Sequence, residues 1–179
     1  PAILKPAVGG GGSANVFIVQ DRDELAVFAR HLLGFCEKLI VQEYIGDPSG
    51  EYTVGVLFGR NGDLINSIGV RRIMENALSI RTRVPNRIRS SKFGKFLVVS
   101  SGVSQGEVGR WPAITKKCEE IASRLNPTAC VNIQCRQEEG RIIPFEINPR
   151  FSGTTSLRAM VGFNEPDVLI RREILGEPI

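Results

Sequence analysis

The stretch that decides the fold is FEINPRFSG, residues 145–153. Polar residues recur in it at every second position, as Glu146, Asn148 and Arg150. Alternate residues of a strand point to one face of a sheet, so Glu146 and Asn148 share a face, and Arg150 follows at the same spacing. Pro149 forces the residue before it into an extended conformation. The stretch therefore predicts a strand with a fixed end that carries a carboxylate and an amide on one side, with Arg150 following at the same spacing.

A second polar strand precedes this stretch. Asn132 and Gln134 lie two positions apart within the expected strand Ala129–Arg136, and a Glu-Glu-Gly turn leads from there to the expected strand Ile142–Ile147. If the two strands pair across this turn, Gln134 and Glu146 come side by side. Hard cations such as Mg²⁺ prefer oxygen ligands and keep substrate phosphates in their shell. The face is therefore a candidate metal site, and a polar face turned to solvent is the alternative.

A run of glycines marks the N-terminal part of the chain, between the expected strands Ala2–Leu4 and Val16–Val19. The run consists of Gly9, Gly10, Gly11 and Gly12. Neither helix nor strand propensity can hold four glycines, so the run is either a flexible link or a turn whose backbone approaches a ligand. Lys5 precedes it, and the backbone N–H groups could wrap phosphates. The run matches neither the P-loop nor GxGxxG.

The remaining pattern predicts an α+β fold with mainly antiparallel strands. Helices are expected after a cap at Asp21 or Asp23, at Pro112–Leu125 and at Asp167–Leu175, and further strands at Leu39–Ile45, Tyr52–Phe58, Asp63–Val70 and Leu97–Ser101. An Asn-Gly pair at residues 61–62 indicates a hairpin. A cluster of turn residues at 46–50 predicts a junction between a small subdomain, residues 1–45, and a larger one, residues 46–179.

Charge is concentrated in one segment. The chain of 179 residues has a net charge of +4, but residues 71–95 alone carry +7. The basic residues are Arg71, Arg72, Arg81, Arg83, Arg87, Arg89, Lys92 and Lys95, against Glu75. Such a segment either binds phosphates or acidic ligands or is a solvated loop. Nucleic acid is a poor fit, because only Phe93 among these residues is aromatic.

The composition excludes several classes of protein. No apolar run approaches the roughly 20 residues of a membrane helix, and no basic-then-apolar leader is present. The four cysteines form no CxxC pair and accompany a single histidine, which argues against zinc. They are expected to pack as small apolar groups in a reducing cytoplasm. The chain begins with Pro1, so we expect it to be part of a longer protein.

Four motifs in this order resemble the ATP-grasp superfamily, and within it the ATP-binding domain of the large chain of carbamoyl-phosphate synthase. They are Lys5-Pro6 with the glycine run, residues 41–45 (VQEYI), residues 50–54 (GEYTV) and residues 145–153. The resemblance covers nearly the whole chain. It implies two α+β subdomains that hold ATP between them.

The resemblance also implies roles for particular residues. Lys5 resembles the residue that binds the α- and β-phosphates, and Gly9 to Gly12 with Ser13 resemble the lid over the triphosphate. Glu43, Tyr44 and Ile45 resemble the hinge at the adenine edge, and Glu51 the acceptor for the ribose hydroxyls. Gln134, Glu146 and Asn148 are similar to the ligands of Mg²⁺ or Mn²⁺. Arg150 resembles the arginine that steadies the transferred phosphoryl group, in work that Arg71 or Arg72 would share.

These roles imply a carboxylate-activating ligase that uses ATP and Mg²⁺. A small-molecule carboxylate would attack the γ-phosphate, and an amine or similar nucleophile would then displace phosphate from the acyl phosphate. The alternative is a non-catalytic ATP-binding module, or an inactive fragment of a larger carbamoyl-phosphate synthase-like protein. Family members carry an N-terminal domain before this region, which we expect as a partner from the same chain. A homo-oligomer stays open, and nucleic acid and membrane are not expected as partners.

Two features depart from the family pattern. Gly55 stands where relatives often have an acidic residue, and residues 71–95 match no pattern of the family. The identity of the substrate does not follow from the sequence.

Overall fold

The computed structural model divides the chain into two compact units, each of them α+β. The described residues are 1–9, 12–75 and 78–179. The first unit comprises Pro1–Ser49 and Met74–Gln105, and the second comprises Gly50–Ile73 and Gly106–Ile179. Residues 74–105 therefore pack with the N-terminal residues, whereas the boundary expected from the sequence kept 46–179 together.

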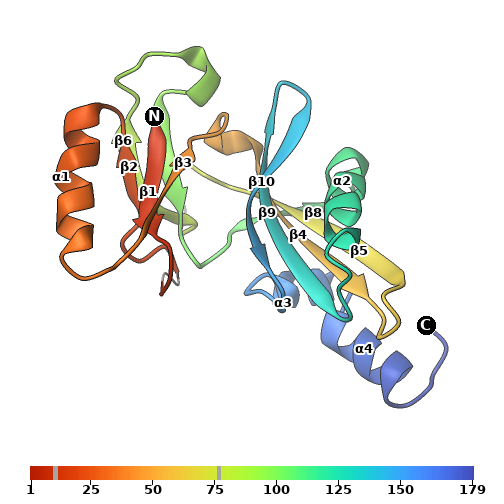
Figure 1. Ribbon diagram of the computed structural model, residues 1–179. Helices are drawn as coiled ribbons and strands as arrows, with labels where there is room; N and C mark the ends of the chain where they lie inside the picture. Colours follow the sequence, from red (N-terminus) through yellow and green to blue (C-terminus); the bar gives the residue numbers. More distant parts are fainter. Residues whose placement is uncertain (10–11, 76–77) are drawn as a thin grey trace. The chain divides into compact units, whose positions relative to one another are not determined.

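The first unit contains one helix, a three-stranded sheet and a hairpin (Figure 1). Its elements are β1 (Ala2–Pro6), β2 (Phe17–Val19), α1 (Arg22–Leu33), β3 (Leu39–Glu43), β6 (Ile80–Pro85), a 3₁₀ turn (Ser91–Phe93) and β7 (Phe96–Ser100). The sheet has the order β2-β1-β3, and β6 pairs with β7. All of these pairings are antiparallel.

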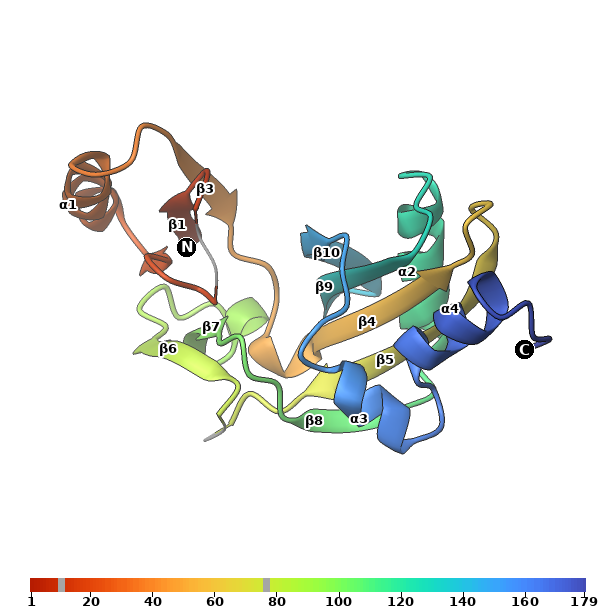
Figure 2. The ribbon, with the colours of Figure 1, turned by 90° about the horizontal axis from the view of Figure 1, so that it is seen from below.

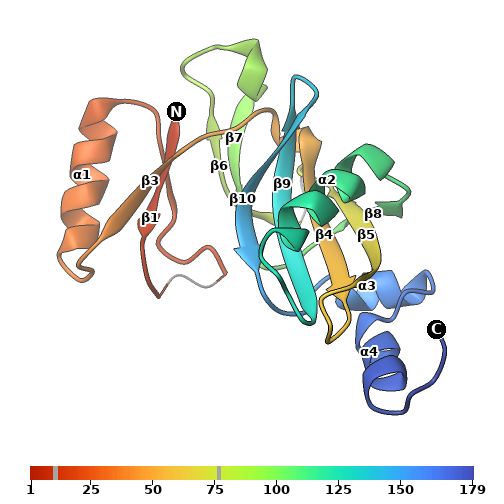
Figure 3. The same ribbon diagram turned by 45° about the vertical axis from the view of Figure 1, so that its right-hand side comes forward.

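Alternation along β1 explains how the first unit packs in layers. Leu4 is fully buried in a cluster with Val19 and with Leu32 of α1. Ile3 points the other way and packs with a cluster that includes Ile18, Leu97 and Val99. The three-stranded sheet therefore lies between α1 on one side and the β6–β7 hairpin on the other (Figure 3).

The second unit is built on a five-stranded antiparallel sheet. Its elements are β4 (Glu51–Phe58), β5 (Leu64–Arg72), β8 (Gly106–Gly109), α2 (Pro112–Ser123), β9 (Cys130–Glu138), β10 (Arg141–Asn148), α3 (Thr155–Met160) and α4 (Glu165–Glu173), and a 3₁₀ turn, Pro48–Gly50, leads into β4. The strand order is β10-β9-β4-β5-β8.

The two faces of this sheet differ in character. On one face α2 buries Ile114, Cys118 and Ala122 against Val54 and Ile133. Figure 2 shows α3 and α4 on the opposite side of β4 and β5 from α2. Because β4 is buried along its whole length, its alternate residues supply an apolar core on one side and a buried polar layer on the other.

Several local predictions are confirmed. Asp21 is the N-cap of α1, and its side chain accepts a hydrogen bond from the Glu24 N–H at 2.8 Å. The Asn-Gly pair lies in the β4–β5 turn, where Gly62 has a φ of 79°. The expected strand at Tyr52–Phe58 corresponds to β4.

Other local predictions are wrong or incomplete. The terminal helix begins at Glu165 rather than Asp167, and β3 ends at Glu43 rather than Ile45. The sequence analysis missed β6, although burial alternates along it, because Arg81 and Arg83 were assigned to a basic segment rather than to the exposed face of a strand. It also missed β8 and α3, which have four and six residues and are too short for a periodic pattern.

All four cysteines are free, as the sequence suggested. Cys118, Cys130 and Cys135 are buried, and Cys36 is half-buried. Burial raises the pKa of the Cys130 thiol to about 11, so it is un-ionised at neutral pH. Among the described residues, no helix is long and apolar enough to cross a membrane.

Tyr44 joins the end of β3 to the hairpin, which leads to a stability prediction. Its hydroxyl accepts from the Val98 N–H at 2.7 Å and donates to the Val98 carbonyl at 3.2 Å. Tyr44→Phe leaves both buried backbone groups without this partner, so we expect a loss of about 1–3 kcal/mol of unfolding free energy in urea titration. The control is Tyr52→Phe, whose hydroxyl has no hydrogen bond within the described residues. Equal losses in the two variants would contradict this role of Tyr44.

Candidate functional site

A row of three charged side chains crosses the middle of the second unit's sheet. Glu51 on β4 lies opposite Arg136 on β9 in the strand register. Arg71 pairs with Tyr52 across β4 and β5, so the next residue, Arg72, falls on the same face as Glu51. Glu51 accepts from Arg72 Nη1 at 3.2 Å, and from Arg136 Nε at 3.0 Å and Nη2 at 2.9 Å.

The charge in this row is unbalanced. The exposed fractions of Glu51, Arg72 and Arg136 are 0%, 3% and 5%. One carboxylate thus serves two buried guanidiniums, which leaves a net charge of +1 in the triad. Burial lowers the pKa of Arg72, while the nearby carboxylates of Glu51 and Glu146 oppose this effect. The triad therefore adds positive charge to the face that carries the candidate metal ligands.

A second row carries the candidate metal ligands. The register pairs Glu146 with Gln134 and Gln134 with Thr53, so the prediction that Gln134 and Glu146 lie side by side is confirmed. Gln134 Oε1 accepts from Arg72 Nη1 at 3.2 Å. Asn148 Nδ2 donates to Glu146 Oε1 at 2.7 Å. Glu146 is exposed, so its carboxylate is accessible to a ligand.

This donor set fits a magnesium ion that also binds phosphate. Glu146 supplies the one accessible carboxylate, and Gln134 and Asn148 contribute amide oxygens nearby. No group of three or more His, Cys, Asp or Glu side chains in the described part of the chain could hold a metal alone. Mg²⁺ needs only one or two carboxylates when water and substrate phosphates fill its remaining positions.

The structure separates Arg71 from Arg72, which the sequence could not do. Arg71 lies on the α2 face, with its guanidinium 5.7 Å from the centre of the Trp111 ring. Arg72 lies on the polar face against Glu51 and Gln134. Of the two arginines, only Arg72 is therefore placed beside the candidate metal ligands.

A third group of polar residues continues the same face. Asn132 Oδ1 accepts from Thr53 Oγ1 at 3.0 Å and from Arg158 Nη2 at 2.8 Å. Arg158 forms a buried ion pair with Glu165 at 3.2 Å. Burial lowers the pKa of Arg158, and the Glu165 carboxylate opposes this.

The Arg158–Glu165 ion pair explains why residue 55 is a glycine. A Cβ at Gly55 would lie 2.2 Å from Arg158 Nη1 and 2.2 Å from Glu165 Oε1. Real Cβ atoms do not approach so closely, and both neighbours are held in a buried ion pair. A glycine at position 55 thus has a physical reason, because the ion pair fills the space of a side chain.

Arg150 lies on an exposed loop between β10 and α3. Its Nη1 donates to the carbonyl of Phe151 at 2.9 Å, so the guanidinium stays on its own loop. The loop begins directly after Asn148, which places Arg150 next to the candidate metal ligands in the chain.

In the first unit, Lys5 and Ser13, which follows the glycine run, form hydrogen bonds with different residues. Lys5 Nζ donates to Gln42 Oε1 at 2.8 Å, and within the described residues it forms no ion pair. Ser13 Oγ donates to the Ser100 carbonyl at 2.6 Å, and Gly9 and Gly12 have φ values of 84° and 59°. Gly10 and Gly11 lie outside the described residues.

The expected hinge residues and Glu51 have further roles in the structure. The Tyr44 side chain is buried in the core, and the backbone N–H of Tyr44 donates to the Pro1 carbonyl at 3.3 Å. Glu43 is exposed and Ile45 half-buried. Glu51 binds two arginines through its carboxylate, an ion pairing that the sequence analysis did not include. The contacts of these residues with adenine and ribose stay predictions.

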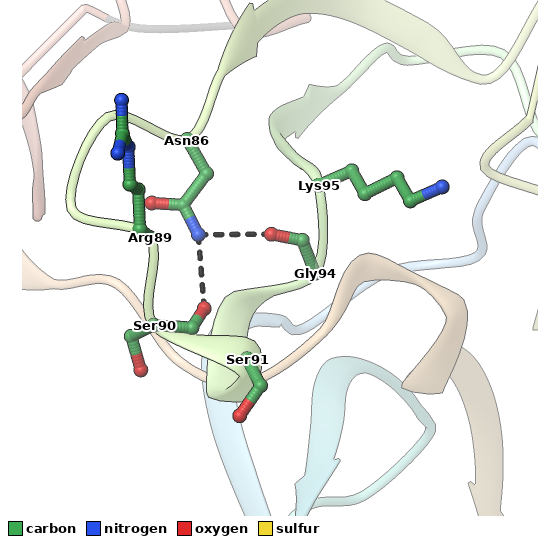
Figure 4. Close-up of a pocket in the computed structure, with 6 residues that line it drawn as sticks. All are labelled: Asn86, Arg89, Ser90, Ser91, Gly94 and Lys95. Carbon is green, nitrogen blue, oxygen red and sulfur yellow. Dashed lines mark hydrogen bonds between the residues drawn. The ribbon is translucent and has the colours of Figure 1, made fainter.

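The basic segment is largely ordered into the β6–β7 hairpin. Arg87 in its loop pairs with Asp21 at 2.8 Å and Glu24 at 2.7 Å. The same loop is held by Asn86, whose side-chain amide donates to the carbonyls of Ser90 and Gly94 beside an open pocket of about 460 Å³ (Figure 4). In that view Arg89 and Lys95 extend in different directions rather than converging.

Comparison with known proteins agrees with the fold. A family model described as "ATP-grasp in the biosynthetic pathway with Ter operon" matches residues 98–177. No curated protein matches the chain in sequence. An ADP complex of N5-carboxyaminoimidazole ribonucleotide synthetase aligns with a TM-score of 0.67 and 16% identity, covering 100% of this chain and 42% of that one. The chain has the ATP-grasp fold.

Two further solved structures are similar to this chain. D-alanine–D-alanine ligase from Bacillus anthracis has a TM-score of 0.55 and 18% identity, over 98% of this chain and 55% of that one. L-amino acid ligase from Bacillus licheniformis has a TM-score of 0.61 and 17% identity, over 96% of this chain and 38% of that one. The chain thus spans about half or less of the length of these structures.

Sequence reasoning missed several residues of the polar face on this ATP-grasp scaffold. Arg136 continues the alternation of Asn132 and Gln134, so the period of two could have found it. Arg158 and Glu165 carry no such signal, because they reach the sheet from helices. Their place follows only from tertiary packing.

The charged row gives a second stability prediction. Glu51→Gln removes the charge that compensates Arg72 and Arg136, so we expect a loss of about 3–5 kcal/mol in unfolding free energy, measured by chemical denaturation. Glu177→Gln is the matched control, because its exposed pair with Arg171 at 3.5 Å contributes little. A loss for Glu51→Gln no larger than for this control would contradict the compensating role.

Proposed function

We propose that this chain is the catalytic ATP-binding part of a carboxylate-activating ligase that uses ATP and Mg²⁺. The observation that carries the proposal is the buried row in which Glu51 serves both Arg72 and Arg136. Its excess positive charge lies in the same face as the Glu146 carboxylate and would attract a phosphate chain next to a metal ligand.

The second unit supplies the charge control for phosphoryl transfer. Phosphoryl transfer needs positioning and neutralisation of charge more than a covalent nucleophile. Arg72 would orient phosphate oxygens from its fixed position against Glu51 and Gln134. Arg150, on its exposed loop, would steady the transferred phosphoryl group.

Residues of this face would also hold the metal. Glu146 would bind Mg²⁺ or Mn²⁺ through its carboxylate, with Gln134 and Asn148 contributing amide oxygens. The bound ion supplies positive charge that balances the phosphate oxygens. The Asn148 hydrogen bond to Glu146 fixes the orientation of that carboxylate.

The first unit would contribute the remaining nucleotide contacts. Lys5 has a cationic group without an ion pair in the described residues, which suits the α- and β-phosphates. Backbone N–H groups of the glycine run and Ser13 would cover the triphosphate and exclude water. Glu43, Tyr44 and Ile45 would meet the adenine edge, whereas Glu51 of the second unit would accept from the ribose hydroxyls.

The reaction we propose has two steps. A carboxylate oxygen of a small substrate attacks the γ-phosphorus, which forms an acyl phosphate and releases ADP. An amine nitrogen then attacks the acyl carbon, the bond to the phosphate oxygen breaks, phosphate leaves, and the amine nitrogen releases a proton to solvent. The order of motifs supports a carbamoyl-phosphate synthase-like enzyme, and the free cysteines are consistent with a reducing cytoplasm.

Calorimetric titration with Mg-ATP tests the site. Glu146→Ala removes the only accessible carboxylate of the candidate metal set, so we expect affinity to fall about 10-fold or more. Glu120→Ala, an exposed glutamate of α2 that pairs with Lys117, is the matched control and should bind like the wild type. Absence of binding by the wild type, or equal affinity of Glu146→Ala, would refute the proposal.

A further inference from the structure

Both ends of the loop that carries Arg150 converge on Asn132. At the start of the loop, Asn148 pairs with Asn132 in the β9–β10 register. After the loop, Arg158 Nη2 donates to Asn132 Oδ1 at 2.8 Å. Thr53 Oγ1 donates to the same oxygen at 3.0 Å, so the Asn132 side chain is fixed from two sides. The residues before and after the loop are therefore both held by contacts with the buried Asn132.

The Thr155 hydroxyl links the Arg158–Glu165 ion pair to the loop. Glu165 Oε2 accepts from Thr155 Oγ1 at 3.1 Å. The same hydroxyl oxygen accepts from the Ser152 N–H at 3.3 Å. Because the Thr155 proton is donated to the carboxylate, the oxygen is oriented to accept from the loop. The chain of contacts thus runs from the ion pair to the backbone two residues after Arg150.

The ion pair is deeply buried. Arg158 and Glu165 are each 1% exposed, and the pair fills the space above Gly55. Arg158 Nε has no hydrogen-bond partner among the described residues. A buried ion pair often contributes less stability than apolar residues of the same volume would. Two apolar residues in its place could not form the hydrogen bonds to Asn132 and Thr155.

We propose that Arg158, Glu165 and Thr155 are positioning residues that hold the Arg150 loop for phosphoryl transfer. The proposal rests on the proposed function, because it assigns these residues to the work of Arg150. Arg150 Nη1 bonds to the carbonyl of Phe151 within the loop, so the guanidinium moves with the loop backbone. A loosened Thr155 contact therefore misplaces the guanidinium without touching the candidate metal ligands or Arg72.

The first measurement is hydrogen exchange at the Ser152 amide. Thr155→Val keeps the shape of the side chain and removes the hydroxyl. Loss of one hydrogen bond predicts about fivefold faster exchange at Ser152. Thr115→Val is the matched control, because Thr115 also bonds through its hydroxyl in the first turn of a helix, but on α2. Thr155→Ser restores the hydroxyl and should restore protection.

The second measurement compares Mg-ADP with Mg-ADP plus aluminium fluoride, a mimic of the transferred phosphoryl group. Thr155→Val should bind Mg-ADP like the wild type. Aluminium fluoride increases the affinity of the wild type, and we expect this increase to be about fivefold or more smaller in Thr155→Val. Thr155→Ser should restore it. The proposal is overturned if Thr155→Val matches the wild type in the exchange rate at Ser152 or in the affinity gained from aluminium fluoride. It is also overturned if Thr155→Val loses as much affinity for Mg-ADP alone as for Mg-ADP with aluminium fluoride.

The failure of the proposed function would look different. A wild type that binds neither Mg-ADP nor the aluminium fluoride complex refutes the nucleotide site, and with it the role in phosphoryl transfer. Faster exchange at Ser152 in Thr155→Val would in that case still show that the Glu165–Thr155 contact orders the loop.

Discussion

The carboxylate of Glu51, shared between Arg72 and Arg136, is the interaction on which the second unit depends. Its three side chains come from three adjacent strands, so the ion pairs bridge β5, β4 and β9 across the centre of the sheet. Separating a buried pair leaves an uncompensated charge, which is far costlier than losing an exposed pair. Taken alone, the three side chains of this row carry a net charge of +1, and the Glu146 carboxylate lies near Arg72. In the proposed function, this row attracts the phosphate chain next to the candidate metal ligands.

The rest of the face follows from the antiparallel register. Once Glu51 lies opposite Arg136, the pleat places Thr53 beside Gln134 and Gly55 beside Asn132. The next strand adds Glu146 and Asn148 in the same rows. The opposite face of β4 is apolar and packs against α2, so a register slip of one residue would bury charges in the core. Packing and chemistry therefore fix the same register.

The sequence predicted the parts that depend on local pattern. The alternation at Asn132, Gln134, Glu146 and Asn148 and the turn between their strands were sufficient to predict the pairing. The Asp21 cap and the Asn-Gly hairpin were likewise local. The Arg158–Glu165 pair, the choice of Arg72 over Arg71 and the return of residues 74–105 to the first unit were not predictable, because each depends on contacts between segments distant in sequence. The need for a glycine at position 55 likewise depends on the packing of Arg158 and Glu165 against it.

The most direct test of the central claim follows arginine side-chain signals by NMR while Mg-ATP is added to the ¹⁵N-arginine-labelled protein. Arg71 and Arg72 are neighbours in the chain but lie on opposite faces of β5, so each is the internal control for the other. The account predicts that the Arg72 guanidinium signal shifts on saturation, while that of Arg71 on Trp111 stays in place. An unchanged Arg72 signal at saturating Mg-ATP, or equal shifts of both, would contradict the claim that the buried positive charge receives phosphates.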